Sequence, residues 1–295
     1  MRWLLALVLT LLPLADPAVA LARQLRIIGG GPVAPGAYPW MSGLVHTGEG
    51  SPFCGGSLIR ADWILTAAHC FFDFSTDQQD KFPGDVQVLV GLDDLSGSGE
   101  RFDVSEIVLP PGGPNGFPYD PSSFDQDNDI ALVHLAAPSG APRVREADPA
   151  VQSSLVDGEL VTVLGWGAVT YPNETFPNVL QGVDLPYIST VTCSFTGIAP
   201  VTMNQLCAGL PQGGVDACVG DSGGPLFAMR NGLPRVAGIV SFGEGCAEPN
   251  LPGVYTKVAN YESKFIVATA DEPGAAGAAI ALLGTLALKR VASRA

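Results

Sequence analysis

The chain has 295 residues, which is long enough for one all-β unit with a large hydrophobic core. Its 29 acidic and 15 basic residues give a net charge of −14, and no basic patch stands out, which disfavours nucleic-acid or heparin binding. The 6 cysteines include no Cys-x-x-Cys pair, which argues against zinc or thioredoxin-like chemistry and favours an oxidising compartment. Counting alone leaves about fifteen disulfide pairings open.

Residues 1–22 have the pattern of a secretory signal peptide. The run 4–14 is apolar but short for a membrane span, and small residues up to Ala22 offer cleavage sites. A short basic stretch, 23–26, follows and leads into Ile27. We therefore expect a removed signal and a secreted protein; the alternative is that the apolar run is a buried helix of the folded domain.

Short apolar runs separated by turn residues dominate the middle of the chain. The 36 glycines and 25 prolines supply the turns, and runs such as Val86–Val90, Val161–Leu164 and Val236–Val240 have the length and composition of strands. This pattern predicts a β-barrel or β-sandwich. The turn-rich segment Pro110–Asp125 predicts a long surface loop, which either borders a functional cleft or is a tolerated insertion.

Three histidines are candidates for proton-transfer chemistry. His69 lies in the segment Thr66–Cys70, which directly follows the apolar run 63–65. His46 lies in a polar, glycine-containing stretch and is expected in a surface loop. His134 follows Ile130 and Leu132 at strand spacing and is expected at a sheet face. His69 is therefore the candidate base.

An acid that orients a histidine should be shielded from water. Asp125, Asp127 and Asp129 lie close together, and a solvated acidic loop is the alternative interpretation of each. Asp129 opens the apolar run Ile130–Leu132, which can shield it, so Asp129 is the candidate acid.

The segment Gly220–Pro225 surrounds Ser222, and Asp216 precedes the serine by six residues. A serine hydroxyl is a poor nucleophile unless a base takes its proton and donors receive the charge that develops on the attacked carbonyl. Gly-x-Ser-x-Gly alone would equally suit an α/β-hydrolase. The order His69, Asp129, Ser222 differs from the order in α/β-hydrolases and in subtilisin, and only the chymotrypsin order fits.

With this order, the sequence resembles the trypsin-like (chymotrypsin-fold) serine proteases over residues 27–270. The resemblance rests on a series of motifs in the same order: Ile27-Ile28-Gly29-Gly30, Thr66 to Cys70, Asp129-Ile130-Ala131-Leu132, Asp216 to Pro225, Ser241-Phe242-Gly243 and Pro252 to Val258. It implies an all-β protein of two six-stranded antiparallel β-barrels, with the active site in the cleft between them and a short C-terminal helix. It implies a serine endopeptidase that needs no cofactor.

The resemblance assigns catalytic roles residue by residue. Ser222 is the nucleophile, His69 the general base and acid, and Asp129 the carboxylate that holds the imidazole tautomer. The backbone N–H groups of Gly220 and Ser222 form the oxyanion hole.

The resemblance also implies a specificity pocket for basic side chains. Asp216 lies at its base, Ala217 beside the acid, and Gly243 and Gly253 on the walls. The expected partners are proteins or peptides with Arg or Lys at the cleaved bond, and protein inhibitors. Nucleic acid is not among them.

Activation and cross-linking follow from the same resemblance. Cleavage after Arg26 would remove the propeptide 23–26 and free the amine of Ile27 to pair with Asp221, so the chain is expected to be a zymogen. The implied disulfides are Cys54–Cys70, Cys193–Cys207 and Cys218–Cys246. The acids of the segment 91–100 do not match the calcium loop of some relatives, and no metal is expected.

Residues 271–295 depart from the protease pattern. An Asp-Glu-Pro triplet, the apolar run 274–288 and a basic end are similar to bacterial Pro-Glu-Pro-type sorting tails. We expect transient contact with a membrane or sorting machinery, a location at the cell envelope or outside the cell, and a bacterial source. A final amphipathic helix packed on the barrel, or a flexible Ala/Gly tail, is the alternative.

A second functional class is a protease-fold binding protein that has lost catalysis. Loss of His69, Asp129, Ser222 or the cleavage site before Ile27 would favour it. All four are present.

Overall fold

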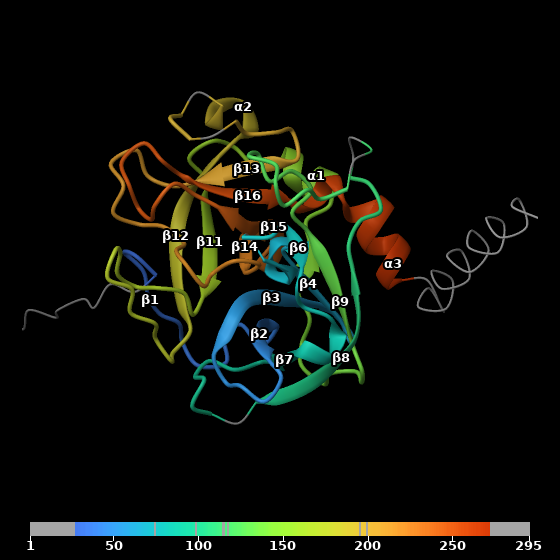
Figure 1. The fold of residues 1–295 in the computed structure, drawn as a ribbon. Helices are drawn as coiled ribbons and strands as arrows, with labels where there is room; N and C mark the ends of the chain where they lie inside the picture. Colours follow the sequence, from blue (N-terminus) through green and yellow to red (C-terminus); the bar gives the residue numbers. More distant parts are fainter. Residues whose placement is uncertain are drawn as a thin grey trace, which may run out of the picture.

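The computed structural model describes residues 27–271 apart from positions 74, 98, 114, 115, 117, 195 and 199. The predicted signal peptide, the propeptide with Arg26, and residues 272–295 of the predicted tail lie outside the described residues. Figure 1 shows two β-barrels side by side, the first built from the blue-to-green part of the chain and the second from the yellow-to-red part.

The first barrel is closed and antiparallel, with the strand order β2-β3-β4-β9-β8-β7. Its strands are β2 (Met41–His46), β3 (Pro52–Arg60), β4 (Trp63–Thr66), β7 (Val86–Val90), β8 (Glu100–Val108) and β9 (Ala131–Leu135). A small hairpin joins β5 (Phe72–Asp73) and β6 (Gln78–Gln79). Valine, leucine and isoleucine fill the barrel because closure turns alternate side chains of each strand inward.

The second barrel is closed by the pairing of β12 with β13 at the ends of the order β12-β11-β14-β15-β16-β13. Its strands are β11 (Leu160–Gly165), β12 (Gln181–Ile188), β13 (Gln205–Ala208), β14 (Pro225–Arg230), β15 (Leu233–Phe242) and β16 (Gly253–Lys257). Two short strands add to it: β1 (Gly31–Pro32) pairs with β12, and β10 (Arg145–Glu146) runs parallel to β15. The predicted pair of six-stranded barrels is therefore confirmed.

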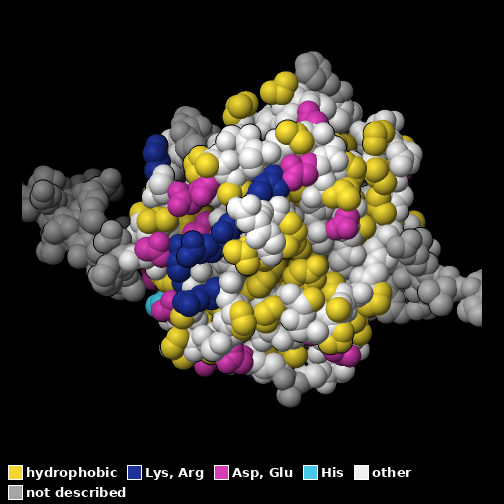
Figure 2. Space-filling model, turned by 180° about the vertical axis from the view of Figure 1, so that it is seen from behind, with side chains coloured by type: hydrophobic (Ala, Val, Ile, Leu, Met, Phe, Trp, Pro, Cys, Tyr) yellow, Lys and Arg dark blue, Asp and Glu magenta, His cyan; other side chains and the backbone are white. Residues whose placement is uncertain are grey.

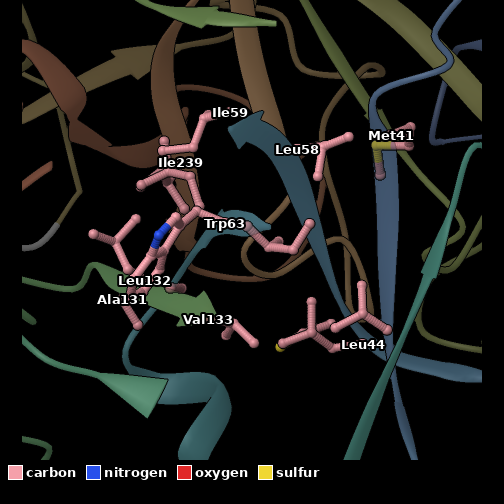
Figure 3. Packing of buried hydrophobic residues seen from close by; sticks show 14 of the residues in the cluster. Met41, Leu44, Leu58, Ile59, Trp63, Ala131, Leu132, Val133 and Ile239 are labelled. Atoms are coloured by element: carbon pink, nitrogen blue, oxygen red, sulfur yellow. The ribbon is translucent and has the colours of Figure 1, made fainter. Parts of the chain in front are cut away.

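One hydrophobic cluster extends from the first barrel across the contact with the second. In Figure 3, Ile239 of β15 lies next to Ile59 and Trp63 of the first barrel. Burial of such side chains stabilises a fold by about 1.5–3 kcal/mol each. This shared core holds the two barrels at a fixed distance, which a site built from both of them requires.

Short helices lie at the ends of strands. They are α1 (Pro149–Ser153), α2 (Thr190–Cys193), and 3-10 turns at His69–Phe71, Pro83–Asp85 and Val258–Asn260. At the C-terminal end, a π-helical segment, Glu262–Val267, continues into α3 (Ala268–Ala270), as predicted for a short C-terminal helix. No helix in the described part of the chain is long and apolar enough to cross a membrane.

The three apolar runs named from the sequence lie in β7, β11 and β15. The described residues of the predicted loop Pro110–Asp125 form no helix or strand between β8 and β9, but the loop is not wholly exposed, because Tyr119 is buried and packs on Phe72. The prediction for His46 was wrong. This residue ends β2 and is half-buried, since its ring packs against Phe53 at 4.8 Å between centroids.

Candidate active site

The pairing of β4 with β9 brings His69 and Asp129 to one edge of the first barrel. Thr66, the last residue of β4, is in register with Ala131, the first residue of β9. His69 follows Thr66 by three residues and Asp129 precedes Ala131 by two, so both leave the sheet at the same place. Nδ1 of His69 lies 2.7 Å from Oδ2 of Asp129, and the backbone N–H of His69 donates to Oδ1 at 2.8 Å.

The second barrel completes the surroundings of Asp129. The hydroxyl of Ser241, on β15, donates to Oδ2 at 2.5 Å, and Thr256 donates to the Asp129 carbonyl at 2.7 Å. Burial alone would raise the pKa of Asp129, but the charge of His69 and the hydrogen bonds from His69 and Ser241 hold it below the ordinary value. An ionised carboxylate only accepts hydrogen bonds. The neutral imidazole therefore carries its proton on Nδ1 and its lone pair on Nε2.

The loop that carries Ser222 packs directly on the histidine segment. The Ser222 carbonyl accepts from the N–H of Gly55 at 2.7 Å. A Cβ at Gly223 would lie 2.2 Å from the Thr66 hydroxyl and 3.2 Å from the N–H nitrogen of Ala67. The two loops can approach this closely only because position 223 has no side chain. Ser222 is thereby held beside the segment that ends in His69.

All three predicted disulfides are present: Cys54–Cys70, Cys193–Cys207 and Cys218–Cys246. The first joins the neighbour of Gly55 to the neighbour of His69, and the last closes the loop around Ser222. Loops of 14 to 28 residues gain on the order of 3 kcal/mol each in the chain-entropy model. Cys54, His69 and Cys70 also form a compact cluster. Their two sulfurs are used by the disulfide, so this cluster does not offer the thiolates that a metal needs.

Asp221 fixes the turn between Gly220 and Ser222 from within. Its side chain is fully buried, and it accepts from the N–H of Gly167 at 2.8 Å and from that of Cys218 at 2.9 Å. Burial raises the pKa of Asp221 to about 7. Ile27 is also fully buried, within the core of the second barrel, so the start of the protease motif is docked rather than exposed.

Asp216 is buried and lines a pocket of about 160 Å³. The lining includes Ser222, Ala217, Gly243 and Gly253, so the predicted pocket residues and the candidate nucleophile lie in one cavity. A Cβ at Gly253 would come within 2.8 Å of the Asp216 carboxylate. Among the described residues only backbone N–H groups, those of Ala247 and Ala217, donate to this carboxylate, and its Oδ1 has no partner.

The electrostatics of Asp216 suit a cationic ligand. Burial first, and the charge of Asp221 in addition, raise the pKa of Asp216 to about 7. The hydroxyl of Tyr255 is buried in the same pocket and has no partner among the described residues. A positively charged group that entered the pocket would supply the missing hydrogen bonds and favour the ionised carboxylate.

The other two aspartates of the candidate cluster have structural roles. Asp127 accepts from Thr202 at 2.8 Å and from Asn204 at 3.0 Å, and the Asp125 carbonyl accepts from Gln205 at 2.6 Å. These contacts tie the loop before Asp129 to the second barrel. Asp129 is the acid that binds the His69 ring, through Nδ1 at 2.7 Å.

His134 is a strand residue, as predicted. It lies on β9, stacks on Trp63 with ring centroids 4.4 Å apart, and contacts Ser105 and Asp62.

Sequence reasoning missed Ser241, Tyr255 and the N–H of Ala247. Ser241 and Tyr255 belong to motifs that the resemblance used, and that membership was the only available signal. The hydrogen bond between Ser241 and Asp129 joins residues 112 positions apart, which no local pattern reveals.

Comparison with known proteins agrees with this geometry. A family model described as Trypsin matches residues 27–265. A vitellin-degrading protease of Bombyx mori is 37% identical over 239 residues, which cover 80% of this chain and 82% of that protein. A trypsin of Xenopus laevis is 34% identical over 240 residues (81% and 88%), and a trypsin of Sus scrofa is 34% identical over 239 residues (80% and 92%). These relatives come from animals and give no support to a bacterial source. The chain belongs to the trypsin family of serine endopeptidases.

Proposed function

We propose that this protein is a secreted zymogen whose active form hydrolyses peptide bonds after Arg, and less efficiently after Lys, through an acyl-enzyme. One observation carries the proposal. The buried His69–Asp129 pair lies at the edge of the first barrel where the Ser222 loop packs, and Ser222 shares its cavity with the buried acid Asp216.

In this mechanism Oγ of Ser222 attacks the carbonyl carbon of the scissile bond while Nε2 of His69 takes the hydroxyl proton. Asp129 stabilises the imidazolium that forms. His69 then gives the proton to the leaving amine, and the acyl-enzyme remains. Water attacks the ester with His69 again as base, which releases the acid product and restores Ser222.

The N–H groups of Gly220 and Ser222 are assigned as the hydrogen-bond donors that stabilise the negative charge on the attacked oxygen. These groups flank Asp221, whose two backbone hydrogen bonds fix the turn. Loss of one such donor in comparable sites costs about 3–4 kcal/mol of transition-state stabilisation.

Specificity is assigned to Asp216. A guanidinium binds a carboxylate through two parallel hydrogen bonds, whereas an ammonium is shorter and more strongly hydrated. Ala217, beside the acid, offers no hydroxyl to a lysine ammonium. Gly243 and Gly253 leave room for the long substrate side chain.

Activation is assigned to cleavage between Arg26 and Ile27. The new amine of Ile27 would form an ion pair with Asp221, which has no cationic side chain against it among the described residues. An unpaired buried carboxylate is costly, so pairing stabilises the conformation that holds the oxyanion turn.

We assign the mature protein to the outside of the cell or the cell envelope. Residues 1–22 supply the export signal, and 272–295 contact a membrane or sorting machinery transiently. Protein inhibitors with an exposed basic residue would compete with substrates for the Asp216 pocket.

Covalent labelling separates this function from that of a catalytically silent binding protein. Activated protein, treated with an aryl sulfonyl fluoride, should gain one adduct on Ser222, and His69→Ala should abolish labelling because the nucleophile loses its base. Labelling of other hydroxyls at the same rate, or none after confirmed cleavage before Ile27, would favour the silent alternative.

A further inference from the structure

Three arginines line a hollow on the surface. The hollow lies at the N-terminal end of β15, and the catalytic residues lie near the C-terminal end of the same strand. Arg235 is near the start of this strand and Ser241 near its end, so the hollow is about 20 Å from the site at 3.3 Å per residue. Figure 2 shows dark blue side chains gathered on one face of the molecule, next to acidic ones. The hollow has a volume of about 380 Å³ and is lined by Arg143, Val144, Arg145, Leu233, Pro234 and Arg235.

The sheet register places two of these charges side by side. β10 runs parallel to β15, and Arg145 is the direct partner of Arg235. Arg143 precedes Arg145 by two residues, so it faces the same side of an extended segment. Like charges directly opposite each other on neighbouring strands are destabilising. An otherwise acidic protein thus keeps a local repulsion that a bound anion would remove.

The other arginines nearby are neutralised. Arg60 binds Glu146 and Asp271, and Arg230 binds Glu159. For Arg143, Arg145 and Arg235 the described residues offer no acidic partner, although Arg143 and Arg145 are exposed and Arg235 is half-buried.

An adjoining groove of about 930 Å³ is lined by the same three arginines and by the nearest acids, which limit the positive area. Glu146 and Asp271 are held by Arg60, and Asp148 caps α1 by accepting from the N–H of Val151 at 2.8 Å. Glu262 also lines the groove. None of these acids lines the three-arginine hollow. The positive area is therefore short, which suits a few oxyanion groups better than the long track of a nucleic acid.

We propose that Arg143, Arg145 and Arg235 form a binding site for sulfate or phosphate ester groups. The planar guanidinium fork matches tetrahedral oxyanions through paired hydrogen bonds. Leu233 and Pro234 add apolar surface against which the carbon skeleton of the ester can pack. Because the cleft lies at the other end of β15, a protein bound through this hollow keeps its active site open. The hollow therefore anchors the enzyme on a surface rich in such esters, independently of catalysis.

Binding is tested on the full chain carrying Ser222→Ala, which prevents self-cleavage. It is titrated calorimetrically at low ionic strength with a heparin octasaccharide and, separately, with tripolyphosphate. We expect binding that weakens with added salt. Arg145→Gln and Arg235→Gln should each weaken it by at least about fivefold, since each removes charge-assisted hydrogen bonds. Arg101→Gln is the control: Arg101 is an exposed arginine of β8 bound to Gln87 and a backbone carbonyl, and its loss should leave affinity unchanged.

The melting temperature of each variant, measured with and without ligand, distinguishes a loss of binding from a loss of folding. Without ligand, Arg235→Gln should not lower the melting temperature, because it relieves the repulsion with Arg145. With octasaccharide, the melting temperature of the parent and of Arg101→Gln should rise, and that of Arg235→Gln should rise less.

The two ligands distinguish the sources of the oxyanion groups. Tighter binding of the octasaccharide identifies sulfate esters on a sugar chain, and tighter binding of tripolyphosphate identifies free phosphates. Failure of both ligands to bind, or equal affinity in Arg145→Gln, Arg235→Gln and Arg101→Gln, would overturn the proposal.

Discussion

Asp129, Asp216 and Asp221 are all buried, but their surroundings affect ionisation in opposite directions. Asp129 receives hydrogen bonds from His69 and Ser241 and has a lowered pKa, whereas burial raises the pKa of both Asp216 and Asp221 to about 7. The first acid is matched to a partner within the fold. Asp216 and Asp221 have no cationic partner among the described residues. In the proposed function, the substrate side chain supplies the positive charge for Asp216, and the amine of Ile27 supplies it for Asp221.

Ser241 tests the ionisation of Asp129. A depressed folded pKa contributes stability that is present above the unfolded pKa of about 4 and is lost as pH falls through the folded value. Ser241→Ala should therefore cost about 1 kcal/mol of unfolding free energy at pH 6 and progressively less below pH 4 (roughly the unfolded value). Urea unfolding in a Ser222→Ala background measures this.

Ser42→Ala is the matched control for that measurement. Ser42 is also a buried serine, but its hydroxyl donates to the carbonyl of Trp40, at 3.3 Å, rather than to a carboxylate. Its loss should cost the same at both pH values. An equally pH-independent cost for Ser241→Ala would contradict the role given to Asp129.

At the scale of elements, the contact between the Ser222 loop and the end of β4 depends on a missing side chain. Gly223 has φ +76°, and a Cβ there would lie 2.2 Å from the Thr66 hydroxyl. Gly223→Ala should therefore destabilise the fold by more than the roughly 1–2 kcal/mol of a left-handed backbone alone, and should lower kcat/KM by separating Ser222 from His69.

Gly232 serves as the control that measures only the cost of a left-handed backbone to the free energy of unfolding. It has φ +75° and lies in the turn between β14 and β15, where a Cβ would meet nothing within 4 Å. Gly232→Ala should show the backbone cost with unchanged kcat/KM. Equal losses of stability and activity in the two variants, measured by urea unfolding and by turnover of a peptide amide, would show that the close approach does not matter.

The strands and the catalytic motifs could be predicted because each signal lies within about ten residues. The sequence of Val86–Val90 alone predicts a strand. The residues next to His69, Asp129 and Ser222 identify each of these three as a catalytic candidate. The contacts that join segments could not be predicted. Ser241 meets Asp129 across 112 positions and Arg60 meets Asp271 across 211. The absence of a basic run also hid the arginine hollow, because Arg145 and Arg235 become neighbours only through sheet pairing.

For the whole molecule, activation is the first test. Arg26→Gln should give a folded precursor with little activity on an Arg peptide amide, because the amine of Ile27 stays in a peptide bond. Replacing residues 23–26 by the recognition sequence of another protease should restore activity on cleavage before Ile27. Arg26 itself suits the proposed specificity, so activation of the parent should accelerate with its concentration. Full activity of the uncut variant would contradict the zymogen.

The tail is the second test. Asp271, which the sequence assigned to the tail, binds Arg60, so the packed unit includes it. A chain that ends at Asp271 should therefore keep its turnover and its melting temperature while shifting from the envelope fraction to the medium. A chain that ends at Ala270 is the comparison, and it should lose up to about 1 kcal/mol through the missing ion pair. Failure of both chains to fold would make residues 272–295 part of the domain.

The central claim is that a serine endopeptidase site works beside a pocket whose buried acid selects basic side chains. The most direct measurement is kcat/KM of the activated enzyme on matched Arg, Lys and Phe peptide amides, with Asp216→Ser as the variant. We predict cleavage after Arg several-fold faster than after Lys, because Ala217 lacks a hydrogen bond worth about 1 kcal/mol, and very little after Phe. Asp216→Ser should reduce Arg cleavage at least about a hundredfold through loss of the charged pair. Equal or better cleavage after Phe, or undiminished Arg cleavage in Asp216→Ser, would contradict the account.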